Sequence, residues 1–256
     1  MKVLHLSDIH YRKAYLSKNP YEEMLSSMDS SFTRLQSVVT NVMTQFNIDV
    51  IVITGDLCDD GSIEDYTFLK SYFDTLGIPV YVCLGNHDIS ENFYQGWCCE
   101  NSNQPYLRTH ENQMSWVCFD NSKHGYANGY IDSKRLTWLE EQLKVHKNCI
   151  VMMHHQFDDV PGTPGLENKY LLQDVLMKYP PVAVFNGHTH WFKTGKIGNI
   201  PYFTAPSVSF RAVNEPDGTV IFSQSQGYCV YEVNAEGVYL MKENEVEGKQ
   251  LSIWRW

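Results

Sequence analysis

The sequence predicts an α/β fold in which a largely parallel sheet carries helices and a second, mainly antiparallel sheet packs against it. Three observations support this prediction. Short apolar runs alternate with amphipathic segments up to residue 185, and the segment after residue 200 has β patterns only. In addition, five apolar runs end directly in Asp, Asn or His side chains, at the place where open α/β sheets bind their ligands.

The first half of the chain alternates strands and helices. Three apolar runs have the length and composition of buried strands: residues 2–6, 50–54 and 80–84. Two segments between them carry apolar side chains at helical spacing: residues 31–45 and 62–77. Residues 11–30 are polar, and we expect an irregular surface excursion there. The β-α-β-α-β order predicts parallel strands with right-handed connections.

The second half begins with an interruption. Residues 89–114 hold aromatic side chains without a period, which predicts a long loop that borders the site. Beyond it, three apolar runs predict strands: residues 116–120, 150–153 and 182–185. Two amphipathic segments predict helices at residues 133–144 and 170–179. Pro and Gly residues predict a loop between them at residues 157–165. The later β segments, which we assign to the second sheet, lie at residues 202–204, 227–233 and 237–242.

No repeat, low-complexity segment or linker interrupts the chain. We therefore expect a single domain over residues 1–256. Its motifs lie in about residues 1–205, and a β-rich part occupies about residues 206–256. A composition of 43% hydrophobic and 20% charged residues is typical of a globular protein with one sizeable core.

Composition also restricts the compartment and the partners. No apolar run approaches the ~18–20 residues that span a membrane, and Met1 leads at once into a strand, so we expect a cytoplasmic protein without a membrane partner. Seven cysteines without a CxxC pair fit that compartment. The net charge of −10 argues against duplex nucleic acid as a partner, but bound cations would still allow a small phosphorylated substrate. Both a monomer and a homodimer fit the sequence.

The residues that end the five strands are of metal-binding types. They are Asp8, His10, Asp56, Asn86, His154, His188 and His190. A closed zinc site takes four ligands, so seven suit two adjacent ions that share one carboxylate. Imidazole, carboxylate and amide ligands without Cys favour two divalent or trivalent transition-metal ions, of Mn, Fe or Zn. Two ions ~3.5–4 Å apart can hold a hydroxide between them and bind the attacking and leaving oxygens of a phosphoryl transfer.

Each motif also has an ordinary explanation. Asp8 and His10 alone would more often form a turn, and the adjacent His154 and His155 could be a buried pair. His188 and His190 are more specific, because alternate residues of an extended segment point the same way. The joint occurrence of the motifs, always at strand ends, is what favours a metal site.

The motifs follow one another in a fixed order: Asp8-x-His10, Gly55-Asp56, Gly85-Asn86-His87-Asp88, His154-His155 and Gly187-His188-x-His190. Over about residues 1–205 this order resembles the calcineurin-like metallophosphoesterases. The resemblance implies two mixed β-sheets packed face to face and flanked by helices. It also implies two ligand sets with Asp56 as the bridge: Asp8, His10, Asp56 and His190 for one ion, and Asp56, Asn86, His154 and His188 for the other.

The resemblance assigns catalytic roles as well. His87 would face the scissile phosphate, stabilising charge or protonating the leaving oxygen, and Asp88 would orient His87. Candidate substrate contacts are Asn86, His87, His155 and Arg12. The motifs are most similar to the class III cyclic nucleotide phosphodiesterases. However, Gln156 and Phe157 follow the His-His pair where that subgroup often has prolines, and this puts the substrate in question.

Three hypotheses about function follow. The leading one is a phosphodiesterase that cleaves a phosphodiester bond in a small substrate by attack of a hydroxide bridging the two ions. A 3′,5′-cyclic nucleotide is a candidate substrate. The alternative is a phosphomonoesterase or a protein phosphatase on the same scaffold, and the sequence does not decide between the two. A non-catalytic metal-binding regulator is the third hypothesis, and the complete set of ligand types together with His87 argues against it.

Overall fold

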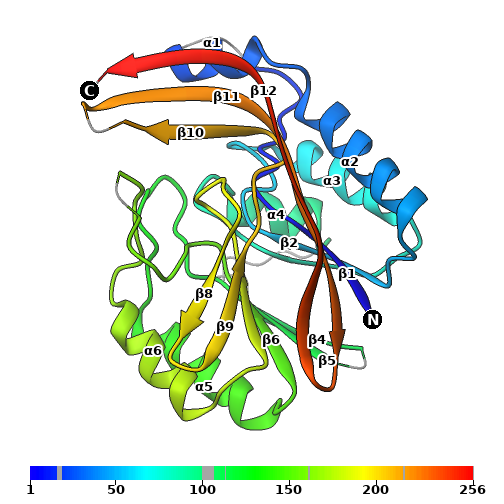
Figure 1. Cartoon of the computed structure of the whole chain (residues 1–256), viewed down its shortest axis with the longest axis vertical. Coiled ribbons are helices and arrows are strands. Elements are labelled where there is room, and N and C mark those ends of the chain that lie inside the picture. Colours follow the sequence, from blue (N-terminus) through cyan, green and yellow to red (C-terminus); the bar gives the residue numbers. More distant parts are fainter. Residues whose placement is uncertain (16–18, 100–106, 113, 161, 216, 256) are drawn as a thin grey trace.

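The computed structural model describes residues 1–15, 19–99, 107–112, 114–160, 162–215 and 217–255 (Figure 1). The strands of these residues form two six-stranded sheets. The first sheet has the order β10 (Phe210–Asn214), β11 (Thr219–Asn234), β1 (Lys2–Leu6), β2 (Val50–Thr54) and β3 (Val80–Cys83), with β12 (Gly237–Arg255) paired to β11. The second has the order β4 (Leu107–Asn112), β5 (Met114–Phe119), β6 (Cys149–Met152), β7 (Ala183–Asn186), β9 (Ile200–Thr204) and β8 (Lys193–Ile197).

Both sheets are mixed. In the first sheet β1, β2 and β3 are parallel, and β10, β11 and β12 are antiparallel to their neighbours. In the second sheet β5, β6, β7 and β9 are parallel, and the edge strands β4 and β8 are antiparallel. Six of these parallel strands are the apolar runs that the sequence predicts, but they divide between two sheets where one largely parallel sheet was expected. The seventh, β9, was expected in an antiparallel sheet and is parallel to β7.

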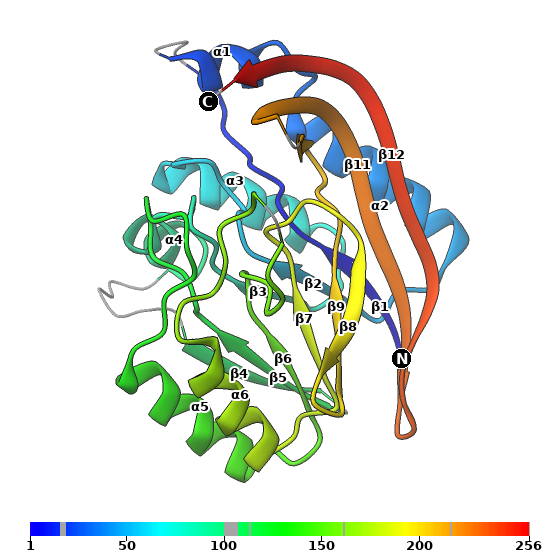
Figure 2. The same cartoon turned by 60° about the vertical axis from the view of Figure 1, so that its left-hand side comes forward.

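The two sheets pack face to face between helices. Along β5, Trp116 and Cys118 belong to the core shared with the first sheet, whereas Val117 and Phe119 pack against α5 (Ser133–Val145) and α6 (Lys169–Lys178). This alternation follows from the two-residue period of a strand. Helices α2 (Ser31–Gln45) and α3 (Ile63–Asp74) lie against the first sheet (Figures 1 and 2). The predicted fold class is confirmed.

The prediction that residues 227–233 and 237–242 belong to a second sheet is wrong. The first half of β11 pairs with β10 and its second half pairs with β1, so these strands extend the first sheet. The long β11–β12 hairpin then curls over one end of the molecule (Figure 2). Hydrophobic patterns define which faces of a strand are buried, but the choice of partner strand depends on residues far away in the chain. The short strands β8 and β10 are also missing from the sequence prediction.

Residues 11–30 contain regular structure where an irregular excursion was expected. Helix α1 (Pro20–Ser26) lies there, and the Asn19 side chain accepts a hydrogen bond from the backbone N–H of Glu22 at its start. A helix of seven residues is too short to produce a clear periodic pattern.

Residues 89–114 likewise hold α4 (Ser90–Gly96) and β4, so the prediction of one long loop is wrong for the described part. Residues 100–106 and 113 of that prediction lie outside the described residues. The other helices and strands predicted up to residue 204 are confirmed, with ends shifted by at most three residues. Among the described residues, no helix has the length and apolar character needed to cross a membrane.

Candidate metal centre

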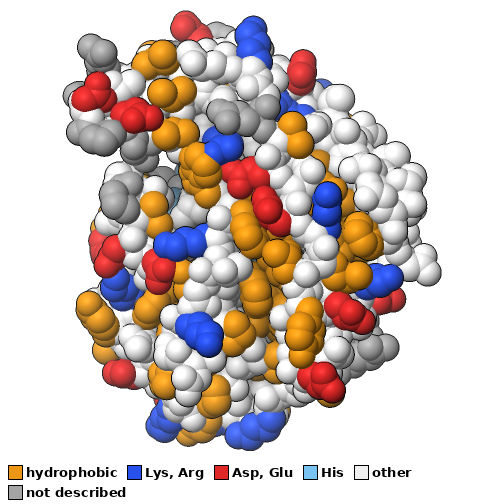
Figure 3. All heavy atoms as spheres, in the orientation of Figure 1, with side chains coloured by type: hydrophobic (Ala, Val, Ile, Leu, Met, Phe, Trp, Pro, Cys, Tyr) orange, Lys and Arg blue, Asp and Glu red, His pale blue; other side chains and the backbone are white. Residues whose placement is uncertain are grey.

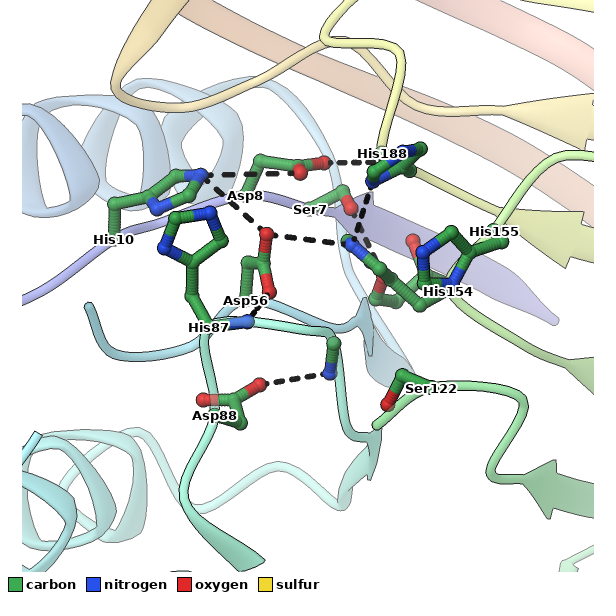
Figure 4. A network of polar contacts seen from close by, with 12 residues as sticks. Ser7, Asp8, His10, Asp56, His87, Asp88, Ser122, His154, His155 and His188 are labelled. Atoms are coloured by element: carbon green, nitrogen blue, oxygen red, sulfur yellow. Dashed lines mark hydrogen bonds and ion pairs between the residues drawn. The ribbon is translucent and has the colours of Figure 1, made fainter. Parts of the chain in front are cut away.

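Asp56 lies at the centre of the polar cluster (Figure 4). It follows β2, and its Oδ2 atom lies 3.3 Å from Nε2 of His154 and 3.6 Å from Nε2 of His10. Its Oδ1 atom accepts a hydrogen bond of 2.9 Å from the backbone N–H of His87. His10 follows β1 of the first sheet and His154 follows β6 of the second. One carboxylate therefore contacts side chains from both sheets.

A second carboxylate, Asp8, connects the remaining histidines. Its Oδ1 atom lies 3.2 Å from Nε2 of His190, and its Oδ2 atom accepts a hydrogen bond of 3.1 Å from the backbone N–H of His188. Nδ1 of His188 lies 3.3 Å from Nε2 of His154. The structure thus brings six predicted ligands into one cluster. The seventh, Asn86, lies buried after β3, next to His87.

The backbone at most of these positions is unusual. Five predicted ligands have φ angles between 47° and 69°: Asp8, His10, Asp56, His188 and His190. Such left-handed conformations cost of order 1–3 kcal/mol each and concentrate at functional sites. They also correct our expectation of an extended segment at His188 and His190. The two rings instead diverge, one toward His154 and the other toward Asp8.

Two glycines allow the ligand loops to approach one another. A methyl group at Gly85 would overlap Oδ1 of Asp56, and one at Gly187 would overlap Oγ of Ser7. Both glycines stand directly before predicted ligands, so the close packing of the loops accounts for their presence.

Backbone carbonyls orient three of the histidines. Nδ1 of His154 donates to the carbonyl of Thr54 at 2.8 Å, and Nδ1 of His190 donates to the carbonyl of Phe210 at 2.6 Å. Nε2 of His188 donates to a carbonyl at 3.2 Å in the same way. The other nitrogen of each ring therefore faces the cluster, toward Asp56, Asp8 and His154 respectively. Metal-binding histidines are held in this manner.

Two buried oxygen atoms in the cluster accept no hydrogen bond of good geometry from the described residues. They are Oδ1 of Asn86 and Oδ1 of Asp8, the latter in spite of its short distance to Nε2 of His190. Buried polar atoms are nearly always paired, so these atoms have capacity for a further ligand. Within the described part of the chain, three groups of acidic and imidazole side chains have ligand atoms within 4.8 Å of one another, and Asp56 belongs to two of these groups. Oxygen and imidazole donors without thiolate fit transition-metal ions.

The electrostatics of the cluster favour cations. Burial by itself would raise the pKa of Asp56, but His154 and His87 hold that pKa well below its ordinary value. His190 likewise overcomes the effect of burial on Asp8 and lowers its pKa. Burial and the neighbouring His154 lower the pKa of His188 to about 3. At neutral pH Asp8 and Asp56 are ionised and His188 is neutral, the protonation states that metal ligands need. Burial would lower the pKa of His154, but Asp56 raises it to about 9, so an ion bound there would displace a proton from that ring.

A family model described as calcineurin-like phosphoesterase matches residues 1–192, three quarters of the chain. The chain belongs to this phosphoesterase family. It is a hydrolase that acts on phosphoester bonds, and the resemblance stated from the motifs is confirmed.

Relatives of this phosphoesterase carry phosphodiesterase names. It is 25% identical to a probable cyclic nucleotide phosphodiesterase of Xenorhabdus bovienii, over 92% of this chain and 97% of the relative. A 3′,5′-cyclic-nucleotide phosphodiesterase of Nostoc sp. is 26% identical, over 78% and 77%. A probable glycerophosphodiester phosphodiesterase of Arcobacter nitrofigilis is 32% identical, over 64% of each chain.

Two solved structures with the same fold belong to proteins with different roles. A dimetal phosphatase from Danio rerio matches with a TM-score of 0.58 at 13% identity, over 97% of this chain and 99% of that one. GAP50, the anchor in the inner membrane complex of Plasmodium, also matches with a TM-score of 0.58, at 16% identity, over 97% and 89%. At such identities the likeness shows the fold alone.

His87 of this phosphoesterase stands beside the cluster and is held by a residue that our sequence analysis missed. Its Nδ1 atom lies 2.6 Å from Oδ1 of Asp59, a buried carboxylate three residues after Asp56. Partial burial would lower the pKa of His87, but Asp56 and Asp59 raise it to about 10. The ring is therefore protonated at neutral pH. A second aspartate close behind Gly55-Asp56 was the available signal for this contact.

The hydrogen bonds of the Asp88 carboxylate reach the backbone around His87 and not its imidazole. The Asp88 carboxylate accepts hydrogen bonds from the backbone N–H groups of Leu57, Cys58 and Gly85 and from the Tyr66 hydroxyl. These contacts tie the loop after β3 to the loop after β2. Asp88 thereby positions the backbone on which Asp56 and His87 stand, and Asp59 contacts the imidazole.

Two predicted substrate contacts have other surroundings. His155 is fully buried, its Nε2 atom donates to the carbonyl of Ala127 at 3.1 Å, and its ring packs on His188. This geometry argues against contact with a substrate. The Arg12 guanidinium lies 3.5 Å from Glu22 on α1 and above the ring of Tyr15.

Proposed function

We propose that this phosphoesterase is a two-metal phosphodiesterase for a small phosphorylated substrate, with a 3′,5′-cyclic nucleotide as a candidate. The observation that carries the proposal is the place of Asp56. Its carboxylate approaches His10 from one sheet and His154 from the other, so a single side chain can serve two ions. Asp8, His10 and His190 would complete one ligand set, and Asn86, His154 and His188 would complete the other.

The chain's own residues have distinct roles in this proposal. Two bound transition-metal ions would supply Lewis-acid stabilisation of the phosphate and activation of the attacking water. His87 would donate a proton to the leaving oxygen. The contact between Asp59 and Nδ1 of His87 leaves Nε2 as the donating atom and holds the ring in one orientation.

Two alternatives use the same scaffold. A phosphomonoesterase or protein phosphatase would need the same ions, and the phosphodiesterase names of the relatives favour a diester for this chain. A non-catalytic role is compatible with the fold, because one similar structure is that of an anchor protein. The complete set of seven ligand types and the presence of His87 support catalysis.

The test is an assay with added Mn²⁺ on bis-p-nitrophenyl phosphate, p-nitrophenyl phosphate and cyclic AMP, paired with metal analysis. We expect up to two transition ions per chain, hydrolysis of the diesters in preference to the monoester, and loss of activity with a chelator. Faster hydrolysis of p-nitrophenyl phosphate would favour the monoesterase. Full metal content without hydrolysis of any of the three would favour the regulator.

A further inference from the structure

A pocket of about 360 Å³ opens beside His188 and His190. The loop at residues 162–164 forms one wall, and Ala212, Val220 and Phe222 of the C-terminal strands form the opposite wall. In the space-filling view, the molecule is hollowed at the left, below these strands (Figure 3). The volume is in the range of small-molecule sites.

The wall from the C-terminal strands is a continuous apolar face. Ala212 of β10 pairs in register with Phe222 of β11, and Val220 lies two residues before Phe222 on the same face. The ring of Phe222 packs on Trp254 at 4.6 Å between centroids, and α1 covers the same cluster with Met24 and Leu25. Trp254, Met24 and Leu25 thus pack beside the wall on the same face of the sheet and hold its side chains in place.

This wall is also connected to the metal centre. Phe210 precedes Ala212 on β10 by two residues, and its ring lies 4.6 Å from the ring of His190. The carbonyl of Phe210 accepts the hydrogen bond that orients His190. The strand that orients one predicted ligand therefore also contributes to the pocket wall, so the wall stands at a set distance from the site.

Among the described residues, the pocket lining carries no charge outside the site. Apart from His188 and His190, its residues are Gly162, Thr163, Pro164, Thr189, Ala212, Val220 and Phe222. A charged group placed there would lose hydration without gaining a partner among these lining residues. An uncharged group with a flat apolar face would gain from burial against the wall, with threonine hydroxyls available for its polar edge.

We propose that this pocket binds the organic group that is esterified to the substrate phosphate. It selects an uncharged group of nucleobase size over a small or cationic one. Ala212, Val220 and Phe222 are then specificity-determining residues contributed by the C-terminal strands. The proposal rests on the proposed function, because it assumes that phosphate binds at the metal centre.

The experiment is calorimetric titration of the Mn²⁺-loaded protein with three phosphate monoesters that share one anchor. They are adenosine 5′-monophosphate, methyl phosphate and phosphocholine. We expect the nucleotide to bind about tenfold or more tightly than methyl phosphate, and phosphocholine to gain nothing over methyl phosphate. The nucleotide advantage is the ratio of the affinity for adenosine 5′-monophosphate to that for methyl phosphate. In Ala212→Phe, which fills the pocket, this advantage should fall below about threefold. Ala212→Leu is the fallback variant if Ala212→Phe does not fold, and it should reduce the advantage partly.

The matched control is Val213→Phe, which makes the same kind of change at the next residue of β10, on the opposite face. It should keep the full nucleotide advantage. Equal binding of the three esters, or an advantage that Ala212→Phe and Ala212→Leu leave unchanged, would overturn the pocket proposal. A phosphodiesterase leaves these monoesters intact, so the ratio of affinities tests the pocket separately from turnover. A protein without diesterase activity would contradict the proposed function alone.

Discussion

The two sheets contribute unequal halves to the proposed metal centre. The loops after β1, β2 and β3 supply both carboxylates, Asp8 and Asp56, together with the amide of Asn86 and the imidazole of His87. The loops after β6 and β7 supply imidazoles alone, and backbone carbonyls orient His154 and His188 there. The charge of the site thus resides on one sheet and most of its neutral ligands on the other. Neither half is complete, so the proposed centre exists only when the sheets pack together.

The largest expected effect is at Asp56, the residue that contacts both halves. Asp56→Ala should release both ions and lower kcat/KM by at least about 100-fold, since even the outer partners of metal ligands typically account for 10–100-fold. Asp8→Ala is the matched control and should mainly empty one position. Metal analysis by mass spectrometry of both purified variants measures this difference. Full metal content in Asp56→Ala would contradict the bridging role.

The second-largest effect is expected at His87, on the sheet that supplies the carboxylates. Its replacement separates the chemical step from metal binding. His87→Ala should lower turnover by about 10²–10⁴-fold while both ions stay bound. The turnover of a nitrophenyl diester should fall less than that of a nucleoside diester, since the nitrophenolate leaving group needs no proton. The group formed by His10, Asp56 and His87 would also let His87 bind an ion, so loss of one ion in this variant would reassign it as a ligand.

A smaller loss is expected at Asp59, which acts through His87. Asp59→Asn should lower kcat about 10–100-fold with metal content unchanged, because the imidazole loses the carboxylate that fixes its orientation. Asp60→Asn is the control, because Asp60 is the exposed neighbour of Asp59 and its carboxylate contacts His124 instead of the His87 ring. In a His87→Ala background the Asp59→Asn change should have little further effect, and additive losses would refute the coupling.

The smallest effect is expected at Arg12, which the sequence suggested as a substrate contact. Its pairing with Glu22 is a partly exposed ion pair, and such pairs are worth about 0–1 kcal/mol. Arg12→Ala should therefore change kcat/KM by less than about threefold and the free energy of unfolding by less than about 1 kcal/mol. Steady-state kinetics on a nucleoside diester and thermal unfolding measure both. A tenfold rise in KM with unchanged stability would restore the substrate contact.

The sequence alone determined the local elements and the chemical nature of the site. The strands at residues 2–6 and 50–54 and the helix at residues 31–45 have the bounds that their patterns predict. The ligand types were also readable, because a strand that ends in Asp or His carries its chemistry in adjacent residues. Such information is short-range: the period of a strand or helix and the donor atoms of a side chain need no knowledge of distant residues.

Only the tertiary structure decided how these parts combine. The pairing of β11 with β1 placed the C-terminal strands in the first sheet and brought Phe210 to His190. The contact of Asp59 with His87 and the left-handed backbone at the ligand positions arise from loops of different strands packed together. These features depend on pairs of residues that lie far apart in the chain or on close packing between loops. No periodicity or motif in the sequence records such contacts, because their free energy is gained only after the sheets have packed.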